Sequence, residues 1–181
     1  GDLILIDAGV EVDSLYTADI TRTLPINGKF SPAQRKIYML VYEAQLAGFA
    51  AVKPGVPFLE INRAAQRVLA QGLADMGVLT VSAEESMKPE VGLHRRWTLH
   101  GVSHHLGLDV HDLGTRTAPI QVGMVFTIEP GIYIEEEKMG IRIENNFWIT
   151  KTGNIDLMKN IPITVDEIES FMKSTSAKRK K

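Results

Sequence analysis

Histidines gather in one segment in the middle of the chain, where their spacing would suit metal binding. Four of the five histidines lie between positions 100 and 111. They are His100, His104, His105 and His111. Two histidines four positions apart would face the same way on a helix and could hold a metal together. Gly101 and Gly107 disfavour a helix here, so we expect a turn or an irregular strand. The cluster alone is also compatible with surface or core histidines that bind no metal.

Four carboxylates lie in segments that read as strands. Asp7 and Glu129 each follow a short apolar run, whereas Glu144 sits inside one. Strand alternation places Glu144 on the same face as Arg142, and Asp7 and Asp19 could face each other across an antiparallel pair. A charged side chain in an apolar strand is unfavourable unless it is paired or bound to a metal. Each carboxylate alone is equally compatible with an ion pair, a helix cap or an exposed position.

Together these residues form an oxygen-rich set of potential ligands. The set is Asp7, Asp19, His104, Glu129 and Glu144. Carboxylate oxygens suit manganese, cobalt or iron better than a structural zinc, which prefers thiolates and imidazoles. Four carboxylates carry enough negative charge to balance two divalent cations, and a carboxylate can bridge two metals. The count therefore indicates a two-metal site with ions about 3.5–4 Å apart.

Two helices and several short strands must position these residues. Ser31 precedes Pro32, and Gln34 follows three positions after Ser31, which is a capping box with proline at the first helical position. Apolar residues then recur at helical spacing until Pro54. A second helix is expected over residues 57–77. The apolar faces of both helices are interpreted as core.

The rest of the chain is broken by glycine and proline. We expect residues 78–99 to form an irregular, solvated surface segment. The runs that read as strands are Leu3–Ile6, Val122–Ile128, Gly131–Ile134 and Ile141–Ile149. A short final helix is expected over Asp166–Met172. We predict one domain over residues 1–172, followed by a basic, disordered tail over residues 173–181.

Composition excludes several classes of function. The chain has 181 residues, a hydrophobic fraction of 44%, a formal net charge of −2 and no cysteine. It can therefore hold one domain with a core, whereas thiolate chemistry and disulfides are excluded. Neither nucleic acid nor a membrane is an expected partner, and the lack of cysteine fits a cytoplasmic location. The chain opens without methionine on a strand already under way, so we expect upstream residues to be missing.

Six motifs in order resemble those of the aminopeptidase P and prolidase family. They are Asp7-Ala-Gly, Asp19-Ile-Thr-Arg-Thr, His100-Gly-Val-Ser-His104, Gly107-Leu-Asp-Val-His111-Asp, Thr127-Ile-Glu129-Pro-Gly and Gly140-Ile-Arg142-Ile-Glu144-Asn. The resemblance implies an α+β pita-bread fold, incomplete at its N-terminal half. It also implies an Xaa-Pro aminopeptidase, which hydrolyses the bond before a proline at the second position of a peptide, and a homo-oligomer (dimer or tetramer).

The resemblance assigns the metal ligands residue by residue. Asp7 would bind one metal alone. Asp19 and Glu144 would bridge both metals, and His104 and Glu129 would bind the other. The implied cofactor is a pair of divalent cations, with Mn²⁺ preferred and Co²⁺ or Zn²⁺ as alternatives. The implied nucleophile is a water activated by both metals.

The remaining assignments concern catalysis and substrate binding. Glu129 would accept and relay the proton of the attacking water. His100 and His111 would contact the substrate and steady the developing charge or the leaving proline. Arg142 would orient a ligand carboxylate or face the substrate. His105 is expected to line the substrate pocket without binding metal.

The chain departs from the family pattern at one spacing. Asp7 and Asp19 are twelve positions apart, where the family more often shows eleven, so we expect a bulge or a longer turn between them. Two alternative functions remain open. A prolidase would cleave only Xaa-Pro dipeptides, and a metal-free pita-bread protein would act as a binding module. The presence of all five ligand types favours the peptidase.

Overall fold

The chain opens with a β-hairpin closed by a long turn. The computed structural model describes residues 1–178. In it, β1 (Leu3–Glu11) pairs antiparallel with β2 (Thr17–Pro25). Residues 12–16 form the turn, in which Leu15 has a left-handed backbone with a φ of 69°. The ladder runs without interruption from one end of the hairpin to the other. The extra residue between the two predicted aspartate ligands is therefore absorbed by a longer turn, one of the two possibilities that we expected.

This register sets how the two aspartates lie. Asp7 is directly opposite Thr21, and Asp19 is directly opposite Gly9. Two residues directly opposite each other in an antiparallel ladder lie on the same face of the sheet. Residues two positions apart along one strand also share a face. Asp7 and Asp19 therefore lie diagonally on one face of the hairpin, not directly opposite each other. A Cβ atom on Gly9 would lie 2.6 Å from the carbonyl oxygen of Ala18, so glycine allows the strands to approach at this point.

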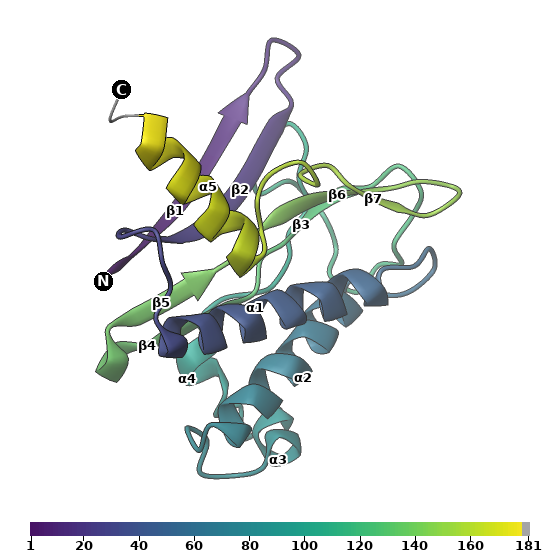
Figure 1. The fold of residues 1–181 in the computed structure, drawn as a ribbon. Coiled ribbons are helices and arrows are strands. Elements are labelled where there is room, and N and C mark those ends of the chain that lie inside the picture. The colour runs from purple at the N-terminus through teal and green to yellow at the C-terminus, as the bar shows by residue number, and fades with distance from the viewer. Residues whose placement is uncertain (179–181) are drawn as a thin grey trace.

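Two packed helices support the strands, as the sequence predicts. Helix α1 (Pro32–Ala51) begins at the capping box, in which the Ser31 side chain accepts from the backbone N–H of Gln34 and the Gln34 side chain accepts from that of Ser31. Helix α2 (Leu59–Asp75) packs along α1. Figure 1 shows α1 lying between the strands and α2. The core sits at this contact, where α1 and α2 bury side chains against the strands.

The segment that we expected to be irregular and solvated contains two short helices. These are α3 (Ala83–Met87) and α4 (Arg95–Thr98). Ser86, His94 and Trp97 are buried, because the Ser86 side chain and carbonyl hydrogen-bond to His94 and the indole joins the core. Helix α3 packs against α2 and lies at the lower end of the helical layer in Figure 1, whereas Val91 and Leu99 of this segment are exposed.

The remaining strands form two small antiparallel sheets. In the first, β6 (Asn145–Ile149) lies between β3 (Val125–Ile128) and β7 (Asn154–Asp156). In the second, β4 (Gly131–Ile134) pairs with β5 (Met139–Arg142), and the 3₁₀ helix η1 over residues 135–137 joins them. Every strand pairing in residues 1–178 is antiparallel.

The expected strand Ile141–Ile149 is interrupted, which corrects the prediction of one continuous strand. The chain leaves the ladder of β5 after Arg142 and enters that of β6 at Asn145. Between them, the Ile143 N–H donates to the carbonyl of Pro130, and the Glu144 N–H donates to that of Thr21. The alternation of side chains over this stretch cannot reveal the break, because both sheets bury the same apolar positions.

The last element is helix α5 (Val165–Lys178), which contacts α1 and overlaps the hairpin in the view of Figure 1. It continues past the predicted end at Met172, because the following residues include neither glycine nor proline. Residues 173–178 of the predicted tail are thus helical, and residues 179–181 lie outside the described residues. In the part of the chain that the structure describes, no helix combines the length and the apolar character needed to cross a membrane.

Candidate metal centre

Three of the five predicted ligands converge tightly. Asp19 from β2, His104 from the irregular segment after α4 and Glu144 from the break between β5 and β6 each place one ligand atom within 4.8 Å of the others. The Nε2 atom of His104 lies 3.6 Å from Oδ2 of Asp19 and 3.9 Å from Oε1 of Glu144. Residues separated by up to 125 positions in the sequence therefore meet at one point.

Glu129, a fourth predicted ligand, lies beside this cluster. It follows β3 directly, and its backbone N–H donates to the carbonyl of Val102, which fixes the direction of its side chain. Its Oε1 atom lies 3.4 Å from Nε2 of His104. The glutamate is thus nearer to the histidine than either of the other two carboxylates.

Asp7 lies at the open edge of the cluster. Its side chain is half exposed, and its Oδ2 atom accepts from Nη2 of Arg142 at 2.6 Å. It is outside the tight group of Asp19, His104 and Glu144, but its charge acts on Asp19, with which it shares a face of the hairpin. The five predicted ligands therefore divide into four converging side chains and one adjacent carboxylate.

Burial makes this cluster electrostatically unfavourable without a cation. Burial, followed by repulsion from Asp7, raises the pKa of Asp19 to about 6. Burial likewise raises the pKa of Glu129 to about 7, against a lowering by Arg142, and burial followed by repulsion from Glu129 raises the pKa of Glu144 to about 8. The carboxyl groups thus resist ionisation because negative charges face one another in a buried site.

The arrangement fits a divalent metal. Within residues 1–178, Oε1 of Glu144 is buried and has no hydrogen-bond partner, although its other oxygen has one. A buried carboxylate oxygen with no partner is costly unless something binds it. Burial also lowers the pKa of His104, which keeps an imidazole nitrogen free of a proton and able to bind a metal. The donor set and the unpaired oxygen therefore suit a cation.

Two residues that sequence reasoning missed hold the ligands in place. The Thr21 hydroxyl donates to Oε2 of Glu144 at 2.7 Å. The Asn146 amide binds the backbone of Asp19 twice, accepting from its N–H at 3.1 Å and donating to its carbonyl at 2.5 Å. Thr21 lies two positions after Asp19, and Asn146 lies two positions after Glu144. The rule that such neighbours share a strand face could have identified both.

His100 and Arg142 meet at a tyrosine that the sequence analysis did not single out. The hydroxyl of Tyr133 lies 2.7 Å from Nε2 of His100 and accepts from Nη1 of Arg142 at 3.0 Å. The other ring nitrogen of His100 lies 2.8 Å from the carbonyl of Gly101 and 4.0 Å from Oε2 of Glu129. His100 and Arg142 thus border the cluster of predicted ligands.

His111 and His105 lie in different surroundings. The ring of His111 lies against that of His104, with centroids 4.3 Å apart, so His111 is at the cluster. His105 is not, because neighbours on an extended backbone point in opposite directions. Its ring stacks on Phe58 with centroids 4.3 Å apart and lines a cavity of about 350 Å³, whose walls include none of the five predicted ligands among the described residues.

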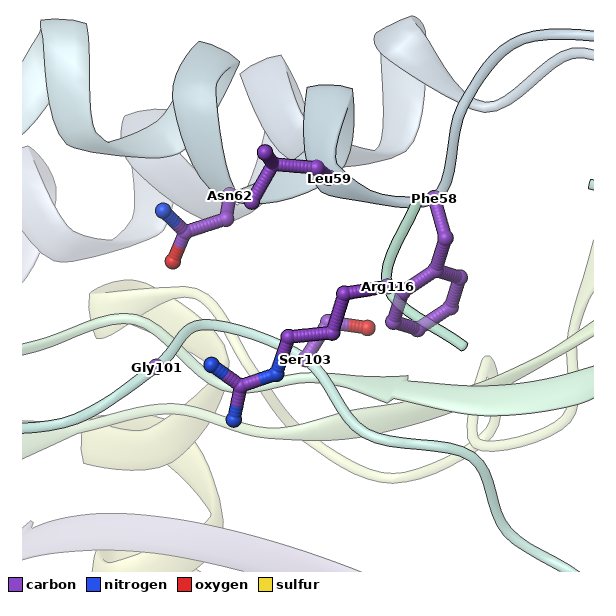
Figure 2. Close-up of a pocket in the computed structure, with 6 residues that line it drawn as sticks. All are labelled: Phe58, Leu59, Asn62, Gly101, Ser103 and Arg116. Atoms are coloured by element: carbon purple, nitrogen blue, oxygen red, sulfur yellow. The ribbon is translucent and has the colours of Figure 1, made fainter. Parts of the chain in front are cut away.

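A second, smaller pocket lies near the start of α2. Figure 2 shows its lining, with the guanidinium of Arg116 reaching past Ser103 towards Gly101. Its volume is about 50 Å³, and the side-chain oxygen of Asn62 accepts from the Val102 N–H beside it. None of the predicted ligands lines this pocket in the part of the chain that is described, so it is distinct from the carboxylate cluster.

Comparisons with known proteins agree with this geometry. A family model described as metallopeptidase family M24 matches residues 1–151. The chain is 44% identical to Xaa-Pro aminopeptidase 1 of Streptomyces coelicolor, over 95% of this chain and 38% of that protein. It is 41% identical to Xaa-Pro aminopeptidase of Escherichia coli, over 95% of this chain and 41% of that protein.

Solved structures resemble this chain in both fold and sequence. Zinc-substituted E. coli aminopeptidase P in complex with product matches with a TM-score of 0.89 at 41% identity, over 96% of this chain and 42% of that one. Pseudomonas aeruginosa aminopeptidase PepP matches with a TM-score of 0.91 at 39% identity, over 98% and 42%. The chain spans about two fifths of these proteins. The predicted fold class, an α+β pita-bread fold of which this chain is a part, is confirmed.

Proposed function

The chain belongs to metallopeptidase family M24, and on this premise we propose that the intact protein is a two-metal Xaa-Pro aminopeptidase. It would hydrolyse the bond between the first residue of a peptide and a proline at the second position. The observation that carries the proposal is the convergence of Asp19, His104 and Glu144 around a buried carboxylate oxygen with no partner. The relatives named Xaa-Pro aminopeptidase support the choice of substrate.

We propose that five residues hold two divalent cations. Asp7 would hold one cation alone, Asp19 and Glu144 would hold both, and His104 and Glu129 would complete the other. The separation of Asp7 from the tight cluster supports this division of the ligands into two groups. When bound, the cations would polarise the scissile carbonyl and lower the pKa of the attacking water towards about 7.

The proton and the substrate are handled by residues of the chain itself. Glu129 would accept the proton of the attacking water, since its carboxyl group is partly exposed and lies beside His104. His100, beside Glu129, and His111, whose ring packs against that of His104, would contact the substrate. Arg142 holds Asp7 in place through its 2.6 Å ion pair. His105 lines a cavity whose walls include none of the five predicted ligands among the described residues, and its proposed contact with substrate would lie there.

The further assignments rest on composition and family resemblance. Manganese is the proposed cation, because four oxygen ligands accompany a single nitrogen. A cytoplasmic location is proposed from the absence of cysteine. A homo-oligomer, as dimer or tetramer, is proposed from the resemblance. Peptides with proline at the second position are the proposed partners, and neither nucleic acid nor a membrane is among them.

Metal content and peptide cleavage test the proposal on the intact protein. We expect two equivalents of a divalent metal per chain and release of the first residue from an Xaa-Pro tripeptide. Asp19→Ala should lose metal and reduce turnover to background, whereas Glu43→Ala, at an exposed position on α1, should retain both. Cleavage restricted to Xaa-Pro dipeptides would indicate a prolidase. A folded, metal-free and inert protein would refute the peptidase and indicate a binding module.

A further inference from the structure

The segment that carries the histidines runs antiparallel beside β3, but its backbone is irregular at Val102. The Glu129 N–H donates to the carbonyl of Val102 at 2.7 Å, and the Thr127 N–H donates to the carbonyl of His104 at 3.0 Å. In a regular antiparallel ladder, the two residues of a hydrogen-bonded pair exchange both of their N–H···O bonds. Val102 departs from this pattern, because its N–H is bonded to a side chain of α2 instead.

The acceptor on α2 is the side-chain oxygen of Asn62, 3.1 Å from the Val102 nitrogen. Val102 is 1% exposed, and a buried N–H group without an acceptor is strongly unfavourable. Asn62 thus supplies the partner that a regular ladder would have provided. Figure 2 shows its amide reaching from α2 towards the segment that carries Gly101 and Ser103.

The place of Val102 in the chain gives this hydrogen bond its consequence for the site. Val102 lies two positions after His100 and two positions before His104. Its carbonyl is also bonded to the N–H of Glu129, whose Oε1 lies 3.4 Å from Nε2 of His104 and whose Oε2 lies 4.0 Å from Nδ1 of His100. A shift of the Val102 backbone would therefore move three side chains of the site relative to the other ligands.

The start of α2 is itself held firmly enough to act as a support. The N–H groups of Phe58 and Leu59 donate to the carbonyls of Ala118 and Arg116, at 2.9 and 2.8 Å. Asn62 is the fourth residue of α2, so it lies within the turn that these bonds fix. The position of its side-chain oxygen is thus set by the helix and the segment over residues 116–118.

We propose that Asn62 is a positioning residue, which holds the backbone of Val102 and through it places His104 and Glu129 for metal binding. The expected effects on metal binding and catalysis rest on the proposed function. The hydrogen bond to Val102 does not, because it lies within this chain. The bond needs only an acceptor oxygen, so aspartate can replace Asn62, whereas leucine of similar size cannot. Arg116 lines the same pocket and offers a cation for the added charge.

Hydrogen exchange of the Val102 amide tests the bond directly, by NMR of the intact, metal-free protein labelled with ¹⁵N-valine. The signal is identified by its loss in Val102→Ile. We expect slow exchange in the wild type and in Asn62→Asp, and exchange about 10-fold faster in Asn62→Leu, as the loss of one hydrogen bond implies. Asn62→Ala, which removes the acceptor without adding an apolar group, should behave as Asn62→Leu. Fast exchange in the wild type, or an unchanged rate in both apolar variants, would overturn the proposal.

Metal titration and kinetics of the intact protein then separate positioning from a purely structural role. Asn62→Leu should bind Mn²⁺ about 10- to 100-fold more weakly, as is typical when a residue that orients a metal ligand is removed. At saturating Mn²⁺ it should lower kcat more than it changes KM, and Asn62→Asp should restore both affinity and kcat. Asn27→Leu is the matched control, because it removes another asparagine oxygen, bonded to the Lys29 N–H in an exposed turn, and should behave as the wild type.

The outcomes distinguish this proposal from the proposed function. Wild-type metal affinity and kcat in Asn62→Leu, or an Asn62→Asp variant as impaired as Asn62→Leu, would contradict the positioning role. A wild-type protein that binds no metal and cleaves no peptide would reject the proposed function. The exchange rate of the Val102 amide would still decide whether Asn62 holds this segment in place.

Discussion

Removing the metals should make the stability of the fold decrease as pH rises. The buried carboxyl groups of Asp19, Glu129 and Glu144 have pKa values raised to about 6, about 7 and about 8. A carboxyl group whose pKa is higher in the folded state than in the unfolded state binds more protons when folded, so each rise in pH favours unfolding. Glu144 acts between its ordinary value of 4.5 and about 8. Below that window both states are protonated, and above it the whole destabilisation is present.

The magnitude follows from Glu144 alone, which is 1% exposed. A rise of its pKa from 4.5 to about 8 corresponds, at about 1.4 kcal/mol per unit, to a destabilisation on the order of 5 kcal/mol. That is comparable to the total stability of many domains, about 5–15 kcal/mol. At about 2–4 °C per kcal/mol, it predicts a fall in Tm on the order of 10–20 °C across the window. Two sets of groups act in the opposite direction. Burial lowers the pKa of His94, His100, His104 and His105, which therefore oppose the trend below 6.5. Glu167, whose pKa is lowered by hydrogen bonds from the backbone of Thr164 and Ile163, opposes it only below 4.5.

Thermal unfolding of the intact protein at about pH 5 and about pH 8, in EDTA or in saturating Mn²⁺, measures this effect. We expect Tm in EDTA to fall as pH rises and the fall to be reversed by Mn²⁺, because a bound cation favours the ionised carboxylates. Glu144→Gln should melt above the wild type in EDTA at the higher pH and gain little from Mn²⁺. Glu43→Gln, at an exposed position on α1, should behave as the wild type. A Tm in EDTA that is constant or increases with pH would refute the reasoning.

Three further substitutions test the surroundings of the centre. Asn146→Ala removes the two hydrogen bonds to the buried backbone N–H and carbonyl of Asp19, so denaturant unfolding should show a loss of stability of about 2–3 kcal/mol. Metal titration should show a weaker affinity, and an unchanged affinity would show that these two hydrogen bonds are dispensable for metal binding. His105→Ala should retain full metal content by elemental analysis and lose about 1 kcal/mol with its stack on Phe58, whereas loss of metal would mean that the neighbouring histidine is not the ligand. Gly9→Ala forces a Cβ to 2.6 Å from the opposite backbone and should lower stability by about 1–3 kcal/mol in the same unfolding assay; a neutral effect would show that the hairpin relaxes easily.

Local signals predicted the helical part of the fold well. The capping box at Ser31 and Gln34 marks the start of α1 because both reciprocal hydrogen bonds depend only on residues within one turn. Gly131–Ile134 is a strand with the expected bounds. The break between β5 and β6 was not predictable in this way, because it depends on Glu144 pairing its backbone with Thr21, more than a hundred positions earlier.

The candidate site shows the same division between local and distant causes. Asp7 and Glu129 were identifiable as candidate ligands by residue type and by their place after apolar runs, Glu144 by its charge inside one, and His104 by the cluster of histidines. The contact of Tyr133 with His100 and Arg142 was not, because it depends on Gly131 and Gly140 leaving room for the ring, which only the register of β4 and β5 reveals. The opposite orientations of His104 and His105 likewise required the backbone path of an irregular segment.

Because Glu144 lies in the gap between strands β5 and β6, the geometry of the metal centre depends on how several parts of the domain are placed relative to one another. Glu144 lies where the polypeptide passes from one sheet to another, and it also contacts the N-terminal hairpin through Thr21. Small relative shifts of the β4–β5 sheet, the β3–β6–β7 sheet and the N-terminal hairpin would move the proposed ligands apart before the hydrogen bonds within any of the three were lost. On heating, we therefore expect metal to dissociate from the protein at temperatures where circular dichroism still records intact secondary structure.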